Sequence, residues 1–377
     1  MVGANKEGLI GCLSIIKDPR VDRTKRHPLV CVLFIGICAV LCGAESWEQM
    51  EDFGNERKEW LEQYVALPHG IPSHDTFGRV FAQIDPKAFQ ESFLSWVKLV
   101  NLKKPGQIIS IDGKTLRRSH DHRNGKEALH LVSAWASANH LVLGQVKTDD
   151  KSNEITAIPE LLKLLDLGGS IVTVDAMGTQ KEIAHAIQDK KGDYVMALKG
   201  NHGLLHDEVK RYWEDPQLPE SEYQSFETAD KGHGRLEIRH YKISDHLQWL
   251  EPKAQWKGLK TIGMVESERI IGERKTIERR YYLSSLKADA KEFARAVREH
   301  WSIENQLHWS LDISFREDQC RVRIQRAAEN FALLRRMALH ILKKDKTQNK
   351  SINRKRWLAA MNPGYLQMLL PGGNLDA

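Results

Sequence analysis

The chain has 377 residues, of which 41% are hydrophobic and 28% charged, and its 56 basic and 50 acidic residues leave a net charge of +6. This composition excludes an intrinsically disordered chain, a collagen-like repeat and a disulfide-dense mini-protein. At roughly 150 residues per domain, the length predicts two or three domains, or one large core that carries an insertion. The small positive excess permits a polyanionic partner without requiring one.

The cysteines and the most apolar stretch favour a cytoplasmic protein. Five cysteines without a C-x-x-C pair predict neither a disulfide framework nor a thiolate zinc site, and the N-terminus lacks the pattern of a secretory signal. Residues 28–44 form a 17-residue apolar run, at the lower limit for a membrane span. Gly36, Gly43 and the charged flanks favour a buried core helix instead, so no membrane partner is expected.

Residues 1–103 are predicted to form an all-helical N-terminal domain. After the apolar run, aromatic and methionine side chains between positions 47 and 64 recur at helical spacing. A turn rich in Pro and Gly then precedes Ser73 and Asp75, either of which could cap the next helix. Two short helices joined in this way could form a helix-turn-helix that binds DNA ends. A helical cap that packs on the next domain is the alternative.

The pattern changes after a linker at 101–107. Short β-branched runs at 107–112, 128–137, 140–148, 170–175 and 193–200 alternate, after the third, with helical segments. The order β-β-β-α-β-α-β-α predicts antiparallel strands followed by units that require parallel pairing, within a mixed α/β sheet flanked by helices. This is the element order of a ribonuclease-H-like domain. Antiparallel strands at about 216–287 then predict a β-rich insertion, and helices resume at Ala288.

Two of the apolar strands end in a carboxylate, at Asp112 and at Asp175. Ligands of open α/β sheets collect at the carboxyl ends of strands, although an aspartate there also serves as an ordinary turn residue. In a sheet of this element order the first and fourth strands lie side by side. Both carboxylates are therefore expected to converge.

A third carboxylate is expected from the helix near the C-terminus. Glu304 shares a stripe with Val297, Trp301, His308 and Leu311 at spacings of three and four residues. The stripe is partly apolar, and a buried carboxylate without a partner is costly, so Glu304 should meet either a basic side chain or a metal ion. Three converging carboxylates are typical ligands of Mg²⁺ or Mn²⁺. Two such ions can catalyse in-line displacement at a phosphodiester.

Five stretches of the sequence closely resemble the H-repeat-associated transposases, a branch of the insertion-sequence DDE transposases. They are IDGKTLR, KTDDKSNEITAIPELL, VDAMGTQKEIA, GDYVMALKGNHG and HWSIENQLHWSLD, and the likeness covers roughly residues 10–345. The resemblance implies a ribonuclease-H-like core in which Asp112, Asp175 and Glu304 form the metal-binding triad. It also implies that the strands between Asp175 and Glu304 are a β-insertion, that the substrate is DNA, and that the DNA-bound protein is a homodimer.

The sequence departs from the broader transposase group around the glutamate. That group has Tyr seven and Arg four residues before the glutamate and a Lys after it, whereas Val297, His300 and Leu311 stand at these positions. Glu317 therefore remains an alternative third carboxylate to Glu304. A polar loop after the third predicted strand explains three more acidic residues more simply: Asp149, Asp150 and Glu154.

Candidate phosphate contacts follow two of the strands. Lys114 lies two residues after Asp112, and Lys199 and Asn201 come after the fifth predicted strand. A flexible cation and an amide at these places could hold phosphate oxygens beside the metal ions. A solvated loop is the alternative, since lysine is normally exposed.

The positive charge is concentrated near the C-terminus. From Arg316 to Arg356 there are 13 basic and 4 acidic residues, a net +9, so the rest of the chain carries −3 of the total +6. This segment, continued by a basic tail at 346–377, is expected to track DNA phosphates beside the metal site. A solvated helix face is the alternative. The arginines expected to contact DNA are Arg321, Arg323 and Arg326.

Together these features predict a DNA transposase that cleaves and joins DNA strands with Mg²⁺ or Mn²⁺, using two ions. Its catalytic domain is expected at 104–345, including the insertion, and its site of action is the nucleoid when DNA is bound. One alternative is an inactive relic that only binds DNA. The other is a metal-dependent nuclease or resolvase of the same fold.

Overall fold

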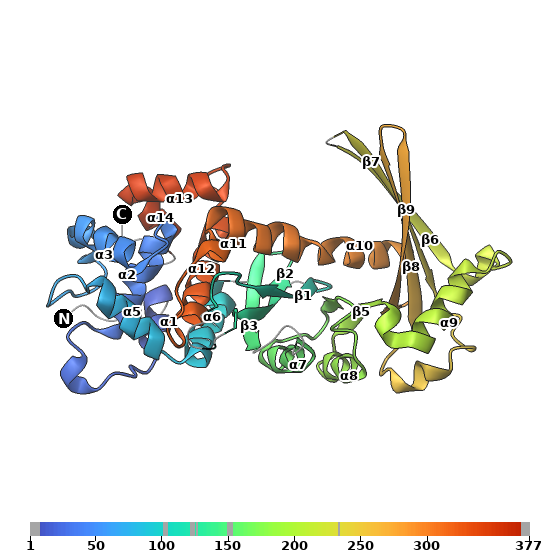
Figure 1. The fold of residues 1–377 in the computed structure, drawn as a ribbon, viewed down its shortest axis with the longest axis horizontal. Coiled ribbons are helices and arrows are strands. Elements are labelled where there is room, and N and C mark those ends of the chain that lie inside the picture. Colours follow the sequence, from blue (N-terminus) through green and yellow to red (C-terminus); the bar gives the residue numbers. More distant parts are fainter. Residues whose placement is uncertain are drawn as a thin grey trace.

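A nine-stranded sheet extends from the centre of the protein to one end of it (Figure 1). The structure is a computed structural model and describes residues 8–100, 105–120, 125, 127–148, 154–232 and 234–370. The strands are β1 (Ile108–Thr115), β2 (His130–Ala136), β3 (Leu141–Thr148), β4 (Ile171–Val174), β5 (Asp193–Leu198), β6 (Gln224–Gly232), β7 (Arg235–Ser244), β8 (Thr261–Ile271) and β9 (Arg274–Ser284).

Helices pack beside and across this sheet. Those before β1 are α1 (Leu9–Ser14), α2 (Leu29–Leu41), α3 (Trp47–Glu56), α4 (Lys58–Leu61), α5 (His74–Gln83) and α6 (Pro86–Val100). Those between the strands are α7 (Glu154–Leu164), α8 (Lys181–Asp189) and α9 (Gly203–Glu214). Those after β9 are α10 (Ala290–His300), α11 (Trp309–Ser314), α12 (Ala327–Lys344), α13 (Ile352–Met361) and α14 (Pro363–Leu369).

The strand order is β3-β2-β1-β4-β5-β9-β8-β7-β6. β1, β4 and β5 pair in parallel, and the other neighbours pair antiparallel, so the predicted mixed α/β sheet is confirmed. The prediction that the first and fourth strands are neighbours is also confirmed, since Ile111 of β1 is in register with Val174 of β4.

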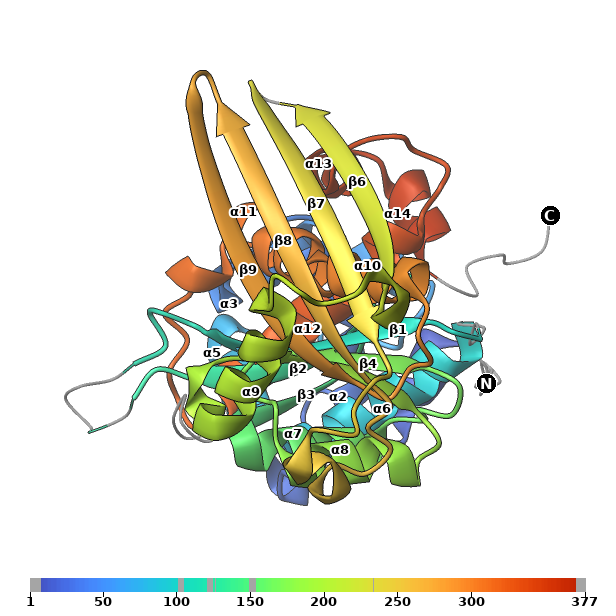
Figure 2. The ribbon, with the colours of Figure 1, turned by 90° about the vertical axis from the view of Figure 1, so that its right-hand side faces the viewer.

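The β-rich insertion continues this sheet. β9 pairs antiparallel with β5, and β6 to β9 form a long four-stranded ribbon that projects beyond the helices (Figure 2). The sequence predicts three strands in this region, but β6 makes a fourth. Its side chains are mostly exposed, and therefore it lacks the apolar alternation by which strands are recognised.

The two faces of β1 pack against different helices. Ile109 and Ile111 share a core with α7 and α8, whereas Ile108 shares a core with Phe293 and Val297 of α10. Successive strand residues point to opposite faces, so Ser110, Asp112 and Lys114 lie on the α10 side with Ile108. The side chains expected to carry the chemistry are therefore turned toward the helical segment that contains Glu304.

The apolar run forms α2, a buried core helix, as predicted. From Leu29 to Leu41 every residue except Val30 is buried. Within the residues that the structure describes, no helix is both long and apolar enough to cross a membrane. All five cysteines are free thiols.

The helices of both chain ends share one hydrophobic core. Residues of α2, α5 and α6 pack with buried residues of α12, α13 and α14, and with Trp135 and Val142 of the sheet (Figure 1). The sequence predicts a basic tail at 346–377, but residues 352–369 instead form two packed helices. Apolar positions such as Leu366 and Leu369 are buried against the bundle, and this burial folds the segment.

Candidate active site

Asp112 lies inside a strand rather than at its end. The sequence predicts that the strand stops at Asp112, but β1 continues to Thr115 because its pairing with β2 continues to His130. Asp175 does follow its strand directly, one residue after the end of β4. Since Ile111 is in register with Val174, the residues that follow these two, Asp112 and Asp175, emerge side by side.

The carboxylate of Asp112 is mostly buried and lies among other acids. Burial, reinforced by the negative charges of Asp175 and Glu304, raises the pKa of Asp112 to about 7. The three predicted carboxylates are thus close enough to repel one another. Glu317, the alternative third carboxylate, is not among the acids that raise this pKa.

The loop that carries Asp175 is fixed by hydrogen bonds. The backbone N–H groups of Met177 and Gly178 each donate to Oδ1 of Asp175 at 3.0 Å. The Asn201 side chain donates to the carbonyl oxygen of Ala176 at 2.9 Å. The loop after β5 therefore lies against the Asp175 loop, with Lys199 exposed beside it.

Glu304 lies in a π-helical turn, Ile303–His308, between α10 and α11. The sequence places it on a partly apolar stripe, but the structure exposes it to solvent. The expectation of a buried carboxylate is wrong because the wider π turn rotates this position relative to an ideal α-helix. Among the described residues Glu304 has no ion-pair partner, so its charge is available to a bound cation.

Two histidines near the carboxylates are absent from the sequence predictions. His308 Nδ1 is 3.5 Å from Oδ2 of Asp112, and Nδ1 of His300 is 2.9 Å from the hydroxyl of Thr173 on β4. Burial lowers the pKa of His308 to about 3 and that of His300 to about 4. Both rings are therefore neutral near pH 7. The only sequence signal is their position near Glu304.

A buried pair lies on the other side of β1. His130 Nε2 is 2.7 Å from Oε1 of Glu154, and both side chains are almost fully buried. A Cβ atom at Gly113 would come within 2.3 Å of that carboxylate oxygen, so only glycine fits beside the pair. Glu154 is thus a packed partner of His130, while Asp149 and Asp150 lie outside the described residues.

Glu317 belongs to a different charge cluster. Its Oε1 is 2.8 Å from Nη1 of Arg336, and both side chains are fully buried. Burial raises the pKa of Glu317, but Arg336 and Lys114 outweigh this effect and hold that pKa below its usual value. Because Glu317 is already paired with cations, the geometry favours Glu304 as the third carboxylate of the site.

Lys114 is placed in the same cluster. Its side chain is only 8% exposed, with Nζ 2.7 Å from Asp312 and 2.8 Å from Asp318. A lysine with its ammonium group held in this way does not present a charge to DNA. The position of Lys114 therefore argues against the expected contact with phosphate.

The donor set suits a divalent cation, although its side chains are not yet gathered around one point. Asp112, Asp175 and Glu304 supply hard oxygen ligands, and their mutual repulsion is what a bound cation would relieve. Among the described residues no group of three or more His, Cys, Asp or Glu side chains is close enough together to hold a metal ion. A ligating arrangement thus requires the three side chains to move closer together.

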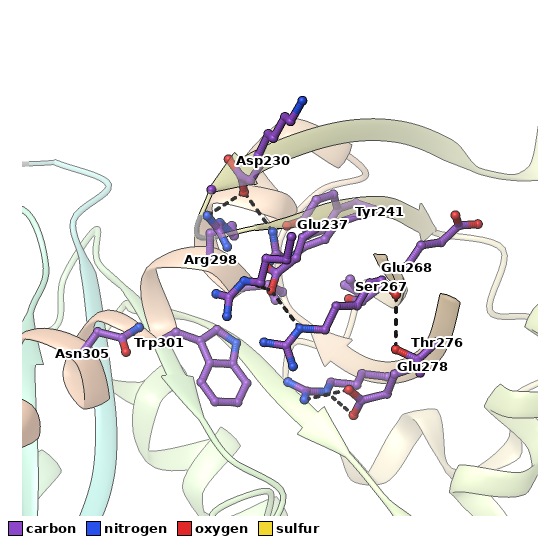
Figure 3. Close-up of a pocket in the computed structure, with 18 of the residues that line it drawn as sticks. Asp230, Glu237, Tyr241, Ser267, Glu268, Thr276, Glu278, Arg298, Trp301 and Asn305 are labelled. Atoms are coloured by element: carbon purple, nitrogen blue, oxygen red, sulfur yellow. Dashed lines mark hydrogen bonds and ion pairs between the residues drawn. The ribbon is translucent and has the colours of Figure 1, made fainter. Parts of the chain in front are cut away.

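An arginine-lined groove runs along the ribbon beside α10 (Figure 3). Its volume is about 680 Å³. Two of its lining residues, Trp301 and Asn305, are close to Glu304 in the sequence. Its basic residues are Lys231, Arg235, Arg239, Arg269, Arg280 and Arg298. Its acidic residues are Asp230, Glu237, Glu268 and Glu278.

Comparison with known proteins accounts for this arrangement. The Transposase DDE domain family matches residues 103–341, and a family described as DDE_Tnp_1-associated matches residues 10–97. The chain belongs to the DDE transposase family. "Putative transposase YncI" of Escherichia coli O157:H7 is 44% identical over 368 residues, which cover 97% of this chain and 94% of that protein.

Two further relatives of this chain differ in the activity that their names state. "H repeat-associated putative transposase YhhI" of Escherichia coli K12 is 43% identical over 369 residues, or 97% of this chain and 98% of that protein. "Inactive transposase YbfQ" of the same strain is 45% identical over 71 residues, which cover 19% of this chain and 84% of that protein. The predicted family resemblance is confirmed.

Part of the C-terminal positive charge is internal. Four of the 13 basic residues between 316 and 356 are buried: Arg335, Arg336, Lys355 and Arg356. Arg356, for example, donates to the carbonyl oxygen of Val40 and lies over the ring of Phe315. The expected phosphate-tracking surface is therefore reduced to the exposed members of the segment.

The three arginines expected to contact DNA lie before α12. Arg321 and Arg326 are exposed, and Arg323 is partly buried. Arg326 lies 3.6 Å from Asp85, and Arg323 donates to the carbonyl oxygen of Arg118. They lie in a different region from the groove on the ribbon, which the sequence does not indicate.

Proposed function

We propose that this protein catalyses metal-dependent cleavage and strand transfer of DNA, with a ribonuclease-H-like core. One observation carries the proposal: Asp112 within β1 and Asp175 directly after β4 lie side by side on adjacent parallel strands, and Glu304 is close enough to raise the pKa of Asp112. The strand order β3-β2-β1-β4-β5 supports the assignment of the core. Residues 9–100 act as a helical region that supports it.

The residues divide the work by their environment. Asp112, Asp175 and Glu304 hold the cations, two Mg²⁺ or Mn²⁺ ions in the proposed mechanism. Such ions, when bound, activate the attacking oxygen and stabilise the leaving oxygen of a phosphodiester. The backbone N–H groups of Met177 and Gly178 orient the Asp175 carboxylate. His308 is neutral and therefore adds no positive charge beside Asp112 that would compete with a bound cation.

DNA is held by the groove on the ribbon together with Lys199 and exposed arginines. The groove carries six basic and four acidic side chains, and Asn305, in the turn that contains Glu304, also lines it. Guanidinium groups suit phosphate oxygens because their donors form a planar fork. Arg321 and Arg326 contact DNA separately, before α12. Two DNA ends require two active sites, so a homodimer forms on DNA at the nucleoid.

The test is cleavage of the element's end DNA by Asp112→Asn. This change removes a charge from the site with little change in shape, so we expect Mg²⁺-dependent cleavage to fall at least 1,000-fold (on the order of 4 kcal/mol) while the DNA affinity stays within about twofold. Asp207→Asn, on the exposed face of α9, is the matched control and should cleave normally.

Three outcomes separate the alternatives. Cleavage retained by Asp112→Asn contradicts the proposed site. DNA binding by the wild-type protein without any cut product supports an inactive relic. Cutting without preference for the element's ends, and without joined product, supports a nuclease or resolvase. Joined product that depends on Mg²⁺ and on Asp112 supports the transposase.

A further inference from the structure

One face of β1 meets a single helical segment at three successive levels. The segment runs from α10 through the π turn into α11. The Ser110 hydroxyl donates to the carbonyl oxygen of Glu299 at 3.3 Å. Two residues on, Asp112 lies 3.5 Å from His308. Two residues further, Nζ of Lys114 lies 2.7 Å from Asp312. The strand and the segment with Glu304 are thus fixed on both sides of Asp112.

The contact at Lys114 is the charged one. Besides Asp312, its ammonium group lies 2.8 Å from Asp318 and 3.9 Å from Glu317. Glu317 in turn is paired with buried Arg336 of α12. Lys114 therefore holds the end of α11 and the following turn against the strand of Asp112, and its single positive charge reduces the repulsion among three acids.

We propose that Lys114 is a positioning residue of the carboxylate site: by binding Asp312 and Asp318, it sets the distance between the Glu304 segment and Asp112. The proposal rests on the proposed function of that site. Asp312 and Glu304 are eight residues apart in one uninterrupted helical stretch, so a displacement at Asp312 is carried to Glu304. Without the lysine, the remaining acids would push the stretch away from β1.

The first experiment measures metal binding rather than turnover. The amount of free Mn²⁺ is followed by electron paramagnetic resonance with the full-length protein and no DNA. In Lys114→Met we expect Mn²⁺ affinity to fall about 10–100-fold, the usual effect of removing a group that orients metal ligands. Cleavage of end DNA should fall by a similar factor at fixed Mn²⁺.

The second experiment separates positioning from a contact with DNA. A lysine that binds phosphate contributes about one unit to the slope of log affinity against log salt concentration. A buried lysine paired with carboxylates contributes nothing to that slope. We therefore expect Lys114→Met to bind end DNA with unchanged affinity and unchanged salt slope.

Lys355→Met is the matched control for stability. Lys355 is 5% exposed and lies 3.1 Å from Asp345, so it is also a buried lysine with a carboxylate partner. It belongs to α13, away from β1. We expect this variant to lose thermal stability as Lys114→Met does, but to bind Mn²⁺ like the wild type.

Several results would overturn the proposal. Wild-type Mn²⁺ affinity in folded Lys114→Met would do so, as would a salt slope reduced by about one unit. An equal loss of Mn²⁺ affinity in Lys355→Met would assign the effect to stability alone. Should Lys114→Met fail to fold, Asp312→Asn removes one contact and leaves Asp318. It should weaken Mn²⁺ binding in the same direction, and unchanged affinity would contradict the proposal.

The two proposals fail in different ways. Cleavage of DNA by Asp112→Asn would contradict the proposed function, independently of the result for Lys114→Met. Asp112→Asn without cleavage, together with Lys114→Met of wild-type Mn²⁺ affinity, would leave the function standing and remove Lys114 from the site.

Discussion

Two buried carboxylates of this protein have opposite surroundings. Burial, reinforced by the negative charges of Asp175 and Glu304, raises the pKa of Asp112 to about 7, and the nearby ring of His308 is neutral. Glu317 is fully buried, but Arg336 and Lys114 lower its pKa. A carboxylate that lacks a cation in the folded chain is suited to bind one from solution, whereas a paired one stabilises the fold.

This contrast predicts a pH-dependent stability for the metal-free protein. The folded pKa of Asp112, about 7, exceeds its ordinary value of 3.8. Between these values the folded state binds a proton that the unfolded state releases, so stability falls as pH rises. The loss is about 4 kcal/mol at pH 8, since each of about three pKa units is worth 1.36 kcal/mol. Denaturation in EDTA should show Asp112→Asn more stable than wild type at pH 8 and similar at pH 4.

Glu317→Gln is the control of opposite sign. The change leaves Arg336 and Lys114 without their buried carboxylate, and breaking a buried ion pair costs about 3–5 kcal/mol. We expect this variant to be less stable than wild type at pH 8 in the same assay. Identical pH profiles for wild type and Asp112→Asn would contradict the assignment of the pH effect to Asp112.

At the scale of elements, the two faces of the ribbon differ, since only one of them forms the groove. Arg279 and Arg280 are neighbours on β9 and so point to opposite faces. Arg280 lines the groove and lies over the ring of Trp301 at 4.8 Å. It also pairs with Glu278 of the same groove at 2.8 Å, whereas Arg279 pairs with Glu266 and Glu214 on the other face. The groove is thus a property of the ribbon's register, since a shift by one residue would exchange the two arginines.

Variants of these two arginines test whether the groove binds DNA. Arg280→Ala should weaken binding to end DNA and lower the salt slope by about one unit, because one phosphate contact is lost. Arg279→Ala removes the same charge from the same strand and should leave the slope unchanged. Affinities are measured over a salt series by fluorescence anisotropy. Equal effects of the two variants would indicate an effect of net charge and not of the groove.

At the scale of the whole molecule, the chain closes on itself. The bundle formed by α1 to α6 is completed by α12 to α14, so its core contains residues from both ends of the sequence. Leu366 of α14 is buried in this core, whereas Met368 on the same helix is 60% exposed. The N-terminal region therefore depends for its stability on helices that follow it by more than 220 residues.

The dependence can be measured with two changes on one helix. Leu366→Ala should lower the free energy of unfolding by about 2–5 kcal/mol, the usual cost of such a core truncation. Hydrogen exchange should show faster amide exchange in α2 as well as in α14. Met368→Ala should change neither quantity appreciably. Loss of protection confined to α14 would show that the N-terminal helices hold together without the C-terminal ones.

Local patterns were enough to predict much of the fold and part of the site. Short β-branched runs predict four of the first five strands closely, and the element order makes β1 and β4 neighbours. The extent of β1 beyond Asp112 was missed because Gly113 and Lys114 break the apolar run, while pairing with β2 continues. Glu304 was placed by ideal helical spacing, which the π turn does not follow.

The sequence by itself determined the family, the mixed sheet and the two aspartates on adjacent strands. These depend on periodicity and motifs within short stretches of chain. Only the tertiary structure decided which charges are paired. Lys114 meets acids about 200 residues later, and Arg356 meets the carbonyl of Val40, 316 residues earlier. A charge count treats every lysine and arginine alike. The partner of each side chain in the folded protein determines whether that side chain can contact DNA or stabilises the interior.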